Sequence, residues 1–239
     1  MISVCIPTYN GEKYLKQQLD SILVQLEKND EIIVSDDSST DSTINLLKSY
    51  QDPRIRILQG NLYKNPIFNL ENALKHAKGD YIFTADQDDI WKNDKVKQMI
   101  QALQKYDLVV SDASIINKNG EIIVNSFFKQ HHSHKGYWKN LWHNHFLGCC
   151  MAFRKDCLQY ILPFPKRIAM HDIWIGLCVE LHGNTFFLPE KLIYYRRHGN
   201  NASQTGEKSR FTRKYQLYYR VYLLVMTTVR RIKSFFILK

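Results

Sequence analysis

The sequence predicts an α/β fold in which a mainly parallel sheet is flanked by helices. Short β-branched or apolar runs alternate with helical patterns from residue 2 to about 110, and acidic groups follow two of these runs. Strands joined by helices of this length imply right-handed crossovers, with helices on both faces of the sheet. The expected strands are 2–6, 31–35, 54–58, 81–84 and 108–111, and the expected helices are 12–27, 40–50, 66–78 and 93–106.

The third of these helices shows the pattern most fully. Pro66 fits its first turn, apolar residues recur at helical spacing, and Gly79 stands where a C-terminal cap belongs. The helix leads into the fourth strand, whose end is followed by Asp86, just as Asp36 and Asp37 follow the second strand. Ligands of such sheets bind beyond the carboxyl ends of the strands, so both acidic groups are expected at one binding edge.

The regular alternation stops after residue 111. Asn119-Gly120 predicts a hairpin turn between 114–117 and 121–125. The stretch 126–146 has weak periodicity and is expected to be a mobile loop; its five histidines match no closed zinc site. A further strand is expected to begin at 148–151. This half is predicted to be the smaller, mixed part of the fold that sets specificity.

Length and composition limit the number of domains. The chain has 239 residues, of which 44% are apolar and 13% aromatic, so it can bury a substantial core and is not disordered as a whole. It contains no internal repeat and no low-complexity linker. We expect one domain over 1–205, with halves 1–111 and 112–205, followed by a basic tail at 206–239.

Positive charge is concentrated in that tail. The formal net charge is +10, and residues 208–239 hold nine basic residues and no acid. Together with aromatic and aliphatic residues, this composition suits an interfacial helix attracted to an anionic membrane surface. The alternatives are that the tail packs on the domain 1–205 or against another subunit in a homodimer. The basic residues are Lys208, Arg210, Arg213, Lys214, Arg220, Arg230, Arg231, Lys233 and Lys239.

Cysteine usage and targeting signals bear on localisation. The five cysteines include no C-x-x-C spacing and suggest neither a disulfide framework nor a zinc ribbon. The first residues lack the features of a secretory signal, and no window holds the roughly 18 apolar residues of a membrane span. These features predict a cytoplasmic chain, held peripherally at the inner face of the cell membrane by its tail.

Asp86-Gln87-Asp88-Asp89 is the most informative stretch of the sequence. Three carboxylates within four residues repel one another unless a cation lies between them. Carboxylate oxygens suit Mg²⁺ or Mn²⁺, and Mg²⁺ often completes its shell with the phosphates of a substrate. The stretch therefore predicts a metal–diphosphate site, and the alternative is a solvated turn that caps the helix beginning near Asn93.

The first strand ends in groups that can hold a nucleobase. Pro7-Thr8-Tyr9-Asn10 offers a hydroxyl, an aromatic face and an amide, which suit stacking and edge hydrogen bonds. A strand-to-helix turn capped by Asn10 is the alternative. Asp36 or Asp37 can accept a hydrogen bond from a base or ribose, or can serve locally in capping the next helix.

Three stretches in succession resemble the signatures of family 2 glycosyltransferases. They are VCIPTYNG at 4–11, IVSDDSSTD at 33–41 and DQDDIW at 86–91, and their order and spacing make the match specific. The resemblance covers about 2–205. In addition, YRRHGNNAS at 195–203 is similar to the ending of a bacterial subgroup that includes rhamnosyltransferases of surface-polysaccharide assembly. The resemblance implies a Rossmann-like GT-A fold and a nucleotide diphosphate-sugar donor.

The resemblance also implies roles for particular residues. It places Thr8 and Tyr9 against the base, gives Asp86 ribose or metal contacts, and gives Asp88 the metal that bridges the two phosphates. Asp89 is expected to support its neighbours and Trp91 to pack. The predicted nucleotide-sugar-binding residues are Pro7, Thr8, Tyr9, Asn10, Asp36, Asp37, Asp86, Gln87, Arg196 and Arg197, and the predicted metal ligands are Asp86, Asp88 and His198.

Asp172 is the predicted catalytic base. Direct attack by an acceptor hydroxyl needs a base on the face opposite the leaving group. Asp172 stands where the family commonly has a Glu-Asp pair before a helix, and His171 departs from that pattern. The alternative role of Asp172 is a helix cap.

These features together predict a metal-dependent, inverting glycosyltransferase. It would move a sugar from a UDP- or dTDP-sugar to an acceptor hydroxyl, on a lipid-linked glycan of bacterial O-antigen or capsule synthesis. One rival is a sugar-nucleotide nucleotidyltransferase, although the first strand is not followed by a Gly-rich, basic phosphate loop. The other is a basic nucleic-acid-binding protein, against which the charge confined to the tail argues.

Overall fold

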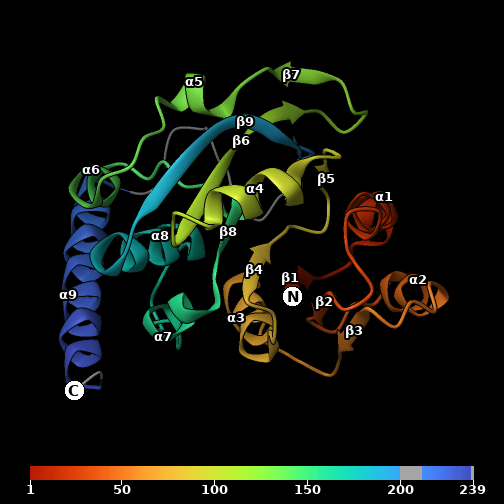
Figure 1. Cartoon of the computed structure of the whole chain (residues 1–239), viewed down its shortest axis with the longest axis horizontal. Helices are drawn as coiled ribbons and strands as arrows, with labels where there is room; N and C mark the ends of the chain where they lie inside the picture. Colours follow the sequence, from red (N-terminus) through yellow and green to blue (C-terminus); the bar gives the residue numbers. More distant parts are fainter. Residues whose placement is uncertain (200–211, 238–239) are drawn as a thin grey trace.

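The computed structural model describes residues 1–199 and 212–237, and in these residues the strands form one sheet (Figure 1). The strand order is β3-β2-β1-β4-β8-β6-β9-β5, with β7 paired to β6. The strands are β1 (Ile2–Thr8), β2 (Glu31–Asp36), β3 (Ile55–Leu58), β4 (Tyr81–Thr84), β5 (Ile90–Trp91), β6 (Leu108–Ile116), β7 (Ile122–Val124), β8 (Met151–Arg154) and β9 (Thr185–Arg196). The helices are α1 (Glu12–Leu23), α2 (Thr43–Ser49), α3 (Pro66–His76), α4 (Lys95–Leu103), α5 (Phe127–His131), α6 (Tyr137–Trp142), α7 (Leu158–Ile161), α8 (His171–His182) and α9 (Arg213–Ile237), with 3-10 turns at Gly148–Cys150 and Lys155–Cys157.

The first half has the predicted alternation of strands and helices. β1 lies between β2 and β4 and is parallel to both, and β2 is parallel to β3. α3 begins at Pro66, where the side chain of Asn65 accepts a hydrogen bond from the backbone N–H of Ile67. The central strand is almost completely buried, as expected for a parallel sheet covered by helices. The predicted fold class is confirmed.

The second half mixes strand directions, as expected. β8 is antiparallel to both β4 and β6, β9 is parallel to β6, and β5 is antiparallel to β9. β6 and β7 form the predicted hairpin, with Gly120 at a φ of 90°. The prediction of a loop over 126–146 was wrong, because α5 and α6 form there and bury Phe127 and Leu141. The apolar side chains that stabilise these short helices are too widely spaced to give a regular helical pattern in the sequence.

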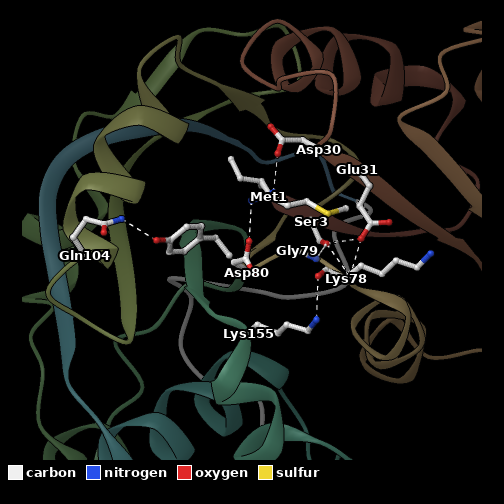
Figure 2. A network of polar contacts seen from close by, with 11 residues as sticks. Met1, Ser3, Asp30, Glu31, Lys78, Gly79, Asp80, Gln104 and Lys155 are labelled. Carbon is white, nitrogen blue, oxygen red and sulfur yellow. Dashed lines mark hydrogen bonds and ion pairs between the residues drawn. The ribbon is translucent and has the colours of Figure 1, made fainter.

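Polar contacts lock the sheet edge that lies opposite the carboxyl ends of β1, β2 and β4 (Figure 2). The buried hydroxyl of Ser3 donates to the Glu31 carboxylate at 2.6 Å and accepts from the backbone N–H of Gly79 at 2.7 Å. The Asp30 carboxylate accepts from the N–H of Ile2 at 2.7 Å. Because β1, β2 and the turn before β4 share these contacts, the three strands start in a fixed register.

α9 packs on the domain through one face and leaves another face exposed. It lies against α6, α7 and α8 (Figure 1), and its Leu223 and Thr227 are fully buried. Its opposite face carries an aliphatic stripe in which each side chain is at least partly open to solvent. Among the helices of residues 1–199 and 212–237, none has the length and apolar character needed to cross a bilayer. The stripe consists of Leu217, Val221, Val225, Val229 and Ile232.

Several residues singled out in the sequence lie outside the described ranges. They are 200–203 at the end of the YRRHGNNAS stretch, the tail residues Lys208, Arg210 and Lys239, and the expected domain boundary at 205.

Candidate functional site

The polar strand ends meet at one edge of the sheet. β1 and β2 are in register so that Thr8 lies beside Asp36, and β1 and β4 so that Cys5 lies beside Thr84. The loop 86–89, which follows β4, therefore leaves the sheet next to the residues that follow β1 and β2. This adjacency is the arrangement that the parallel pairing predicted.

Gln87 joins the acidic loop to the end of β1. Its side-chain oxygen accepts a hydrogen bond from the N–H of Tyr9, and its amide nitrogen donates to the carbonyl of the same residue, both at 3.0 Å. A Cβ atom added to Gly11 would lie 2.4 Å from the oxygen of Gln87. Only glycine at position 11 leaves room for this pair of bonds. Tyr9 itself is 57% exposed.

Asp36 and Asp37 have different surroundings. Asp36 is buried and accepts hydrogen bonds from the hydroxyls of Thr8, at 3.0 Å, and Ser39, at 2.5 Å. It therefore ties β1 to β2. Asp37 accepts from the backbone N–H groups of Tyr63, at 2.6 Å, and Asn65, at 3.2 Å, in the loop that leads to α3.

Asn10 and Pro7 complete the end of β1. Asn10 has a φ of 47°, and its side-chain oxygen accepts from the N–H of Thr40 at 2.8 Å. Its own N–H donates to the hydroxyl of Ser39 at 2.9 Å. Pro7 pairs with Ser35 within the parallel ladder. Asn10 thus joins two loops and does not cap α1, which has no side-chain cap.

Asp88 and His198 meet across the site. The Nε2 atom of His198 lies 2.6 Å from a carboxylate oxygen of Asp88, and this hydrogen bond raises the pKa of the imidazole. The imidazole ring stacks on Tyr14 at a centroid distance of 5.0 Å. A residue that follows β9 is thereby brought to the loop that follows β4.

Asp86 links the acidic loop to Asp172. Burial, together with the charges of Asp88 and Asp172, raises the pKa of Asp86 to about 7. Carboxylates from the β4 loop and from α8 therefore act on one another in a single electrostatic site. Such crowding of negative charge favours protonation or a bound cation.

The donor atoms of this site fit a divalent cation. Carboxylate oxygens such as those of Asp86 and Asp88 are ligands that suit Mn²⁺ or Mg²⁺. Among the described residues, the three side chains whose ligand atoms lie within 4.8 Å of one another are Asp86, Asp89 and Cys149, so the predicted ligands Asp88 and His198 are not part of that group. Burial raises the pKa of Cys149 well above its usual range, which keeps it a thiol and makes it a poor partner for a hard cation.

Arg196 holds the acidic loop 86–89 in place through hydrogen bonds to Asp88 and Asp89. The N–H of Arg196 donates to Asp89 at 2.9 Å, its Nε donates to the carbonyl of Asp88 at 2.9 Å, and an Nη donates to Gln17 at 2.8 Å. Its guanidinium also lies 4.7 Å over the ring of Tyr14. Arg196 is 3% exposed, so its contacts are mainly with the protein.

Arg197 points elsewhere. Its N–H donates to the carbonyl of Ile116 at 2.8 Å, and one guanidinium nitrogen is buried without a hydrogen-bond partner in the described part of the chain. Its charge contributes to lowering the pKa of His131 on α5, after the larger effect of burial. Arg197 thus faces the second half of the fold.

Asp172 lies in the first turn of α8. One carboxylate oxygen accepts from the N–H of Ile173 at 2.7 Å, and the other accepts from the side-chain amide of Asn144 at 3.1 Å. Burial raises the pKa of Asp172, although His171 opposes the shift. The ring of His171 lies against Gly148, where an added Cβ would be 2.3 Å from Nε2.

Comparisons with known proteins identify the family of the chain. The family model "Glycosyl transferase family 2" matches residues 3–162. The chain belongs to glycosyl transferase family 2. The family predicted from the three signatures is therefore confirmed, and the chain is a glycosyltransferase.

Two curated relatives of this glycosyltransferase carry specific names. The UDP-Glc:alpha-D-GlcNAc-diphosphoundecaprenol beta-1,3-glucosyltransferase WfgD of Escherichia coli is 31% identical over 186 residues, covering 77% of this chain and 71% of the relative. The dTDP-rhamnosyl transferase RfbG of Shigella flexneri is 29% identical over 229 residues, covering 87% and 76%.

Solved structures share the fold of the glycosyltransferase. Residues 1–349 of S. aureus TarS in complex with UDP-GlcNAc have a TM-score of 0.71 and 21% identity, covering 94% of this chain and 66% of that one. The mannosyltransferase PcManGT from Pyrobaculum calidifontis, in complex with GDP-Man and Mn²⁺, has a TM-score of 0.59 and 18% identity, covering 97% and 64%. This chain thus spans about two thirds of the length of these neighbours.

Two contacts at the site of the glycosyltransferase had no sequence signal. Asn144, which holds Asp172, lies between two histidines in a stretch of weak periodicity. Gln17, which accepts from Arg196, lies on an exposed face of α1. In contrast, Trp91 packs as expected, being 2% exposed and tilted against Phe83 at a centroid distance of 5.5 Å.

Proposed function

We propose that this glycosyltransferase moves a sugar from a UDP- or dTDP-sugar to a hydroxyl of a lipid-linked glycan in bacterial surface-polysaccharide synthesis, with inversion at the anomeric carbon. The observation that carries the proposal is the joining of loops from separate strands: Gln87 ties the acidic loop 86–89 to the end of β1, and Asp88 lies 2.6 Å from His198, which follows β9. The charge of Asp172, in the first turn of α8, contributes to the raised pKa of Asp86, so candidate cation ligands and a candidate base act on one another, as a single displacement requires.

The donor half of the site suits a nucleotide. The exposed ring of Tyr9 offers a stacking surface, and Asp37, which follows β2, offers a carboxylate acceptor for the base or ribose. Between Asp36 and Asp37 we assign this contact to Asp37, because it is the less buried of the two, 8% exposed against 1% for Asp36. Gln87, Pro7 and Asn10 shape the pocket through the backbone.

Asp86, Asp88 and His198 would hold Mg²⁺ or Mn²⁺ against the two phosphates of the donor. When bound, the cation neutralises the charge that develops on the departing diphosphate. Arg196 fixes the acidic loop that carries these ligands, and Arg197 adds positive charge on the second half of the fold.

Asp172 would act as the base. It accepts the proton of the acceptor hydroxyl as the acceptor oxygen bonds to the anomeric carbon and the bond from that carbon to the nucleotide's phosphate oxygen breaks. Its raised pKa makes the carboxylate a stronger base than an exposed one. The amide of Asn144 orients the carboxylate through its second oxygen.

The donor and the reaction class can be tested together. The purified chain would be mixed with UDP-glucose, UDP-GlcNAc or dTDP-rhamnose, each with and without Mn²⁺. Binding would be followed by thermal shift, and transfer of the sugar to a GlcNAc-diphosphate lipid would be followed by release of nucleoside diphosphate. We expect at least one donor to stabilise the fold only with Mn²⁺ and to be consumed. Release of pyrophosphate from a nucleoside triphosphate and a sugar phosphate would instead identify a nucleotidyltransferase, and salt-sensitive RNA binding would favour the nucleic-acid rival.

We also propose that the exposed stripe of α9 attaches the enzyme peripherally to an anionic membrane surface. Exposed tryptophan rings, Trp138 and Trp142, lie on the neighbouring helix α6, and Arg213 and Lys214 are exposed at the start of α9. Aromatic and aliphatic side chains beside basic ones are the composition of interfacial helices. A lipid-linked acceptor would then lie within reach of the site.

Val225→Asp is expected to reduce binding to phosphatidylglycerol vesicles about tenfold, because it adds one negative charge and removes one apolar contact with lipid. Co-flotation with vesicles would measure the bound fraction. Val24→Asp is the matched control, since Val24 is 74% exposed on the distant α1 side of the molecule. Equal binding by both variants, or no binding by the wild type, would contradict the proposed attachment, and a concentration-dependent dimer lost in Val225→Asp would favour a subunit interface.

A further inference from the structure

One turn of α9 contacts both segments that hold Asp172. The hydroxyl of Tyr219 accepts a hydrogen bond from the N–H of Ala169 at 2.9 Å, three residues before Asp172. The Nε of Arg220 donates to the carbonyl of Trp142 at 2.9 Å. Trp142 lies two residues before Asn144, whose amide binds the carboxylate of Asp172.

The segment that leads into Asp172 depends on such contacts. Residues 162–170 join α7 to α8 without helix or strand structure, and α8 begins without a side-chain cap. The hydroxyl of Tyr222 accepts from the N–H of Arg167 at 3.3 Å. The guanidinium of Arg230 donates to the carbonyls of Leu162 and Pro163. α9 therefore fixes this segment at both of its ends.

Arg220 makes two contacts with Trp142. Its guanidinium carbon lies 4.4 Å over the ring of Trp142, in addition to the hydrogen bond to that residue's carbonyl. The next element of the chain, the loop 143–147, carries Asn144, whose side-chain oxygen accepts from the N–H of Phe146 at 3.0 Å. The loop is thus fixed at its start by α9 and internally by Asn144 itself.

We propose that Tyr219 and Arg220 are positioning residues that set the location of Asp172, so that α9 belongs to the catalytic unit. The inference rests on the proposed role of Asp172 as base. Tyr219 is 9% exposed and holds the backbone before Asp172, while Arg220 holds the loop whose amide binds its carboxylate. Proton transfer is sensitive to displacements of about 1 Å, so loss of either contact should affect the chemical step more than donor binding.

Tyr219→Phe tests the first contact, because it removes only the hydroxyl. Tyr218→Phe is the matched control: Tyr218 is the preceding residue and is 52% exposed. With UDP-glucose, Mn²⁺ and a GlcNAc-diphosphate lipid in detergent, we expect Tyr219→Phe to lower kcat about 3- to 10-fold with an unchanged donor KM. Hydrogen exchange of the Ala169 amide should become about tenfold faster. Tyr218→Phe should match the wild type in both measurements.

Arg220→Ala tests the second contact, with Arg56→Ala as its control, because Arg56 is an exposed arginine on β3. Arg220→Ala should also lower kcat at constant donor KM, and hydrogen exchange of the amides in 143–147 should become faster. Wild-type kcat in both Tyr219→Phe and Arg220→Ala, or a fall in kcat matched by weaker donor binding, would overturn the positioning role. A wild-type chain that turns over none of the donors would overturn the glycosyl-transfer proposal itself. That result differs from the two results that would overturn only the positioning role.

Discussion

Asp172→Asn is expected to lower kcat by about two to four orders of magnitude while leaving Mn²⁺-dependent nucleotide binding intact. An amide cannot accept the proton of the acceptor hydroxyl, and general-base catalysis contributes about 10²- to 10⁴-fold. The substitution keeps the shape of the side chain and its helix-terminal position. Nucleoside diphosphate release would give kcat, and thermal shift with UDP and Mn²⁺ would report binding.

The control for this change is Asp156→Asn, an identical substitution at an exposed position. It should leave both measurements unchanged. The wild-type kcat should also rise with pH through a value above the ordinary carboxyl range, because burial raises the pKa of Asp172 and only the ionised form is a base. This rise of kcat with pH should be missing from the residual activity of Asp172→Asn. An Asp172→Asn enzyme with wild-type kcat would transfer the role of base to another group.

Asp88→Ala is expected to abolish the stabilisation of the fold by Mn²⁺ and to remove turnover with it. Asp88 presents its carboxylate to His198 at 2.6 Å, so the substitution removes one of the proposed oxygen ligands and the partner of the imidazole. The wild type should gain about 2.7 kcal/mol of unfolding free energy at a Mn²⁺ concentration of about 100 times Kd. Thermal or urea unfolding with and without Mn²⁺ measures this difference directly.

The pH dependence of that stabilisation follows from Asp86. Its pKa in the metal-free fold is about 7, above the value of about 3.9 for an unfolded chain. Between these values the folded state binds the extra proton, so metal-free stability should fall as the pH rises from about 4 to 7. Mn²⁺ neutralises the same repulsion, so its effect should be larger at pH 8 than at pH 5.5. Asp94→Ala, at an exposed position beyond the loop, should retain this pattern, and a pH-independent effect of Mn²⁺ would argue against Asp86 as a ligand.

The sequence was sufficient for the parallel half of the fold because its determinants are local. Pro66 and the strand runs mark where elements begin, and parallel pairing then brings Asp36 and Asp86 to one edge without further information. The second half depends on pairs far apart in the chain. β9, for example, pairs with residues of β6 that lie 77 to 80 positions earlier in the chain, and periodicity within one segment does not specify such a partner.

Arg196 and Arg197 show the same limit within the site. As neighbours in the sequence they received one prediction, but adjacent residues of an extended chain face opposite sides. Arg196 therefore contacts Asp88, Asp89 and Gln17, whereas Arg197 acts on His131 of α5. Similarly, the composition of the tail did not distinguish lipid from protein contact. α9 packs on the domain through one face and exposes the other.

The pair formed by Gln87 and Gly11 restricts how donor preference can be re-engineered. The amide of Gln87 bonds to the backbone of Tyr9 and leaves the aromatic ring open, and Gly11 is the residue that gives the amide its space. A chimaera that imports the β1 end of another enzyme with a larger residue at position 11 would displace the side-chain amide of Gln87 and break its two bonds between the acidic loop and the end of β1. Grafts intended to change the sugar nucleotide should therefore move positions 7–11 and 86–89 as one cassette.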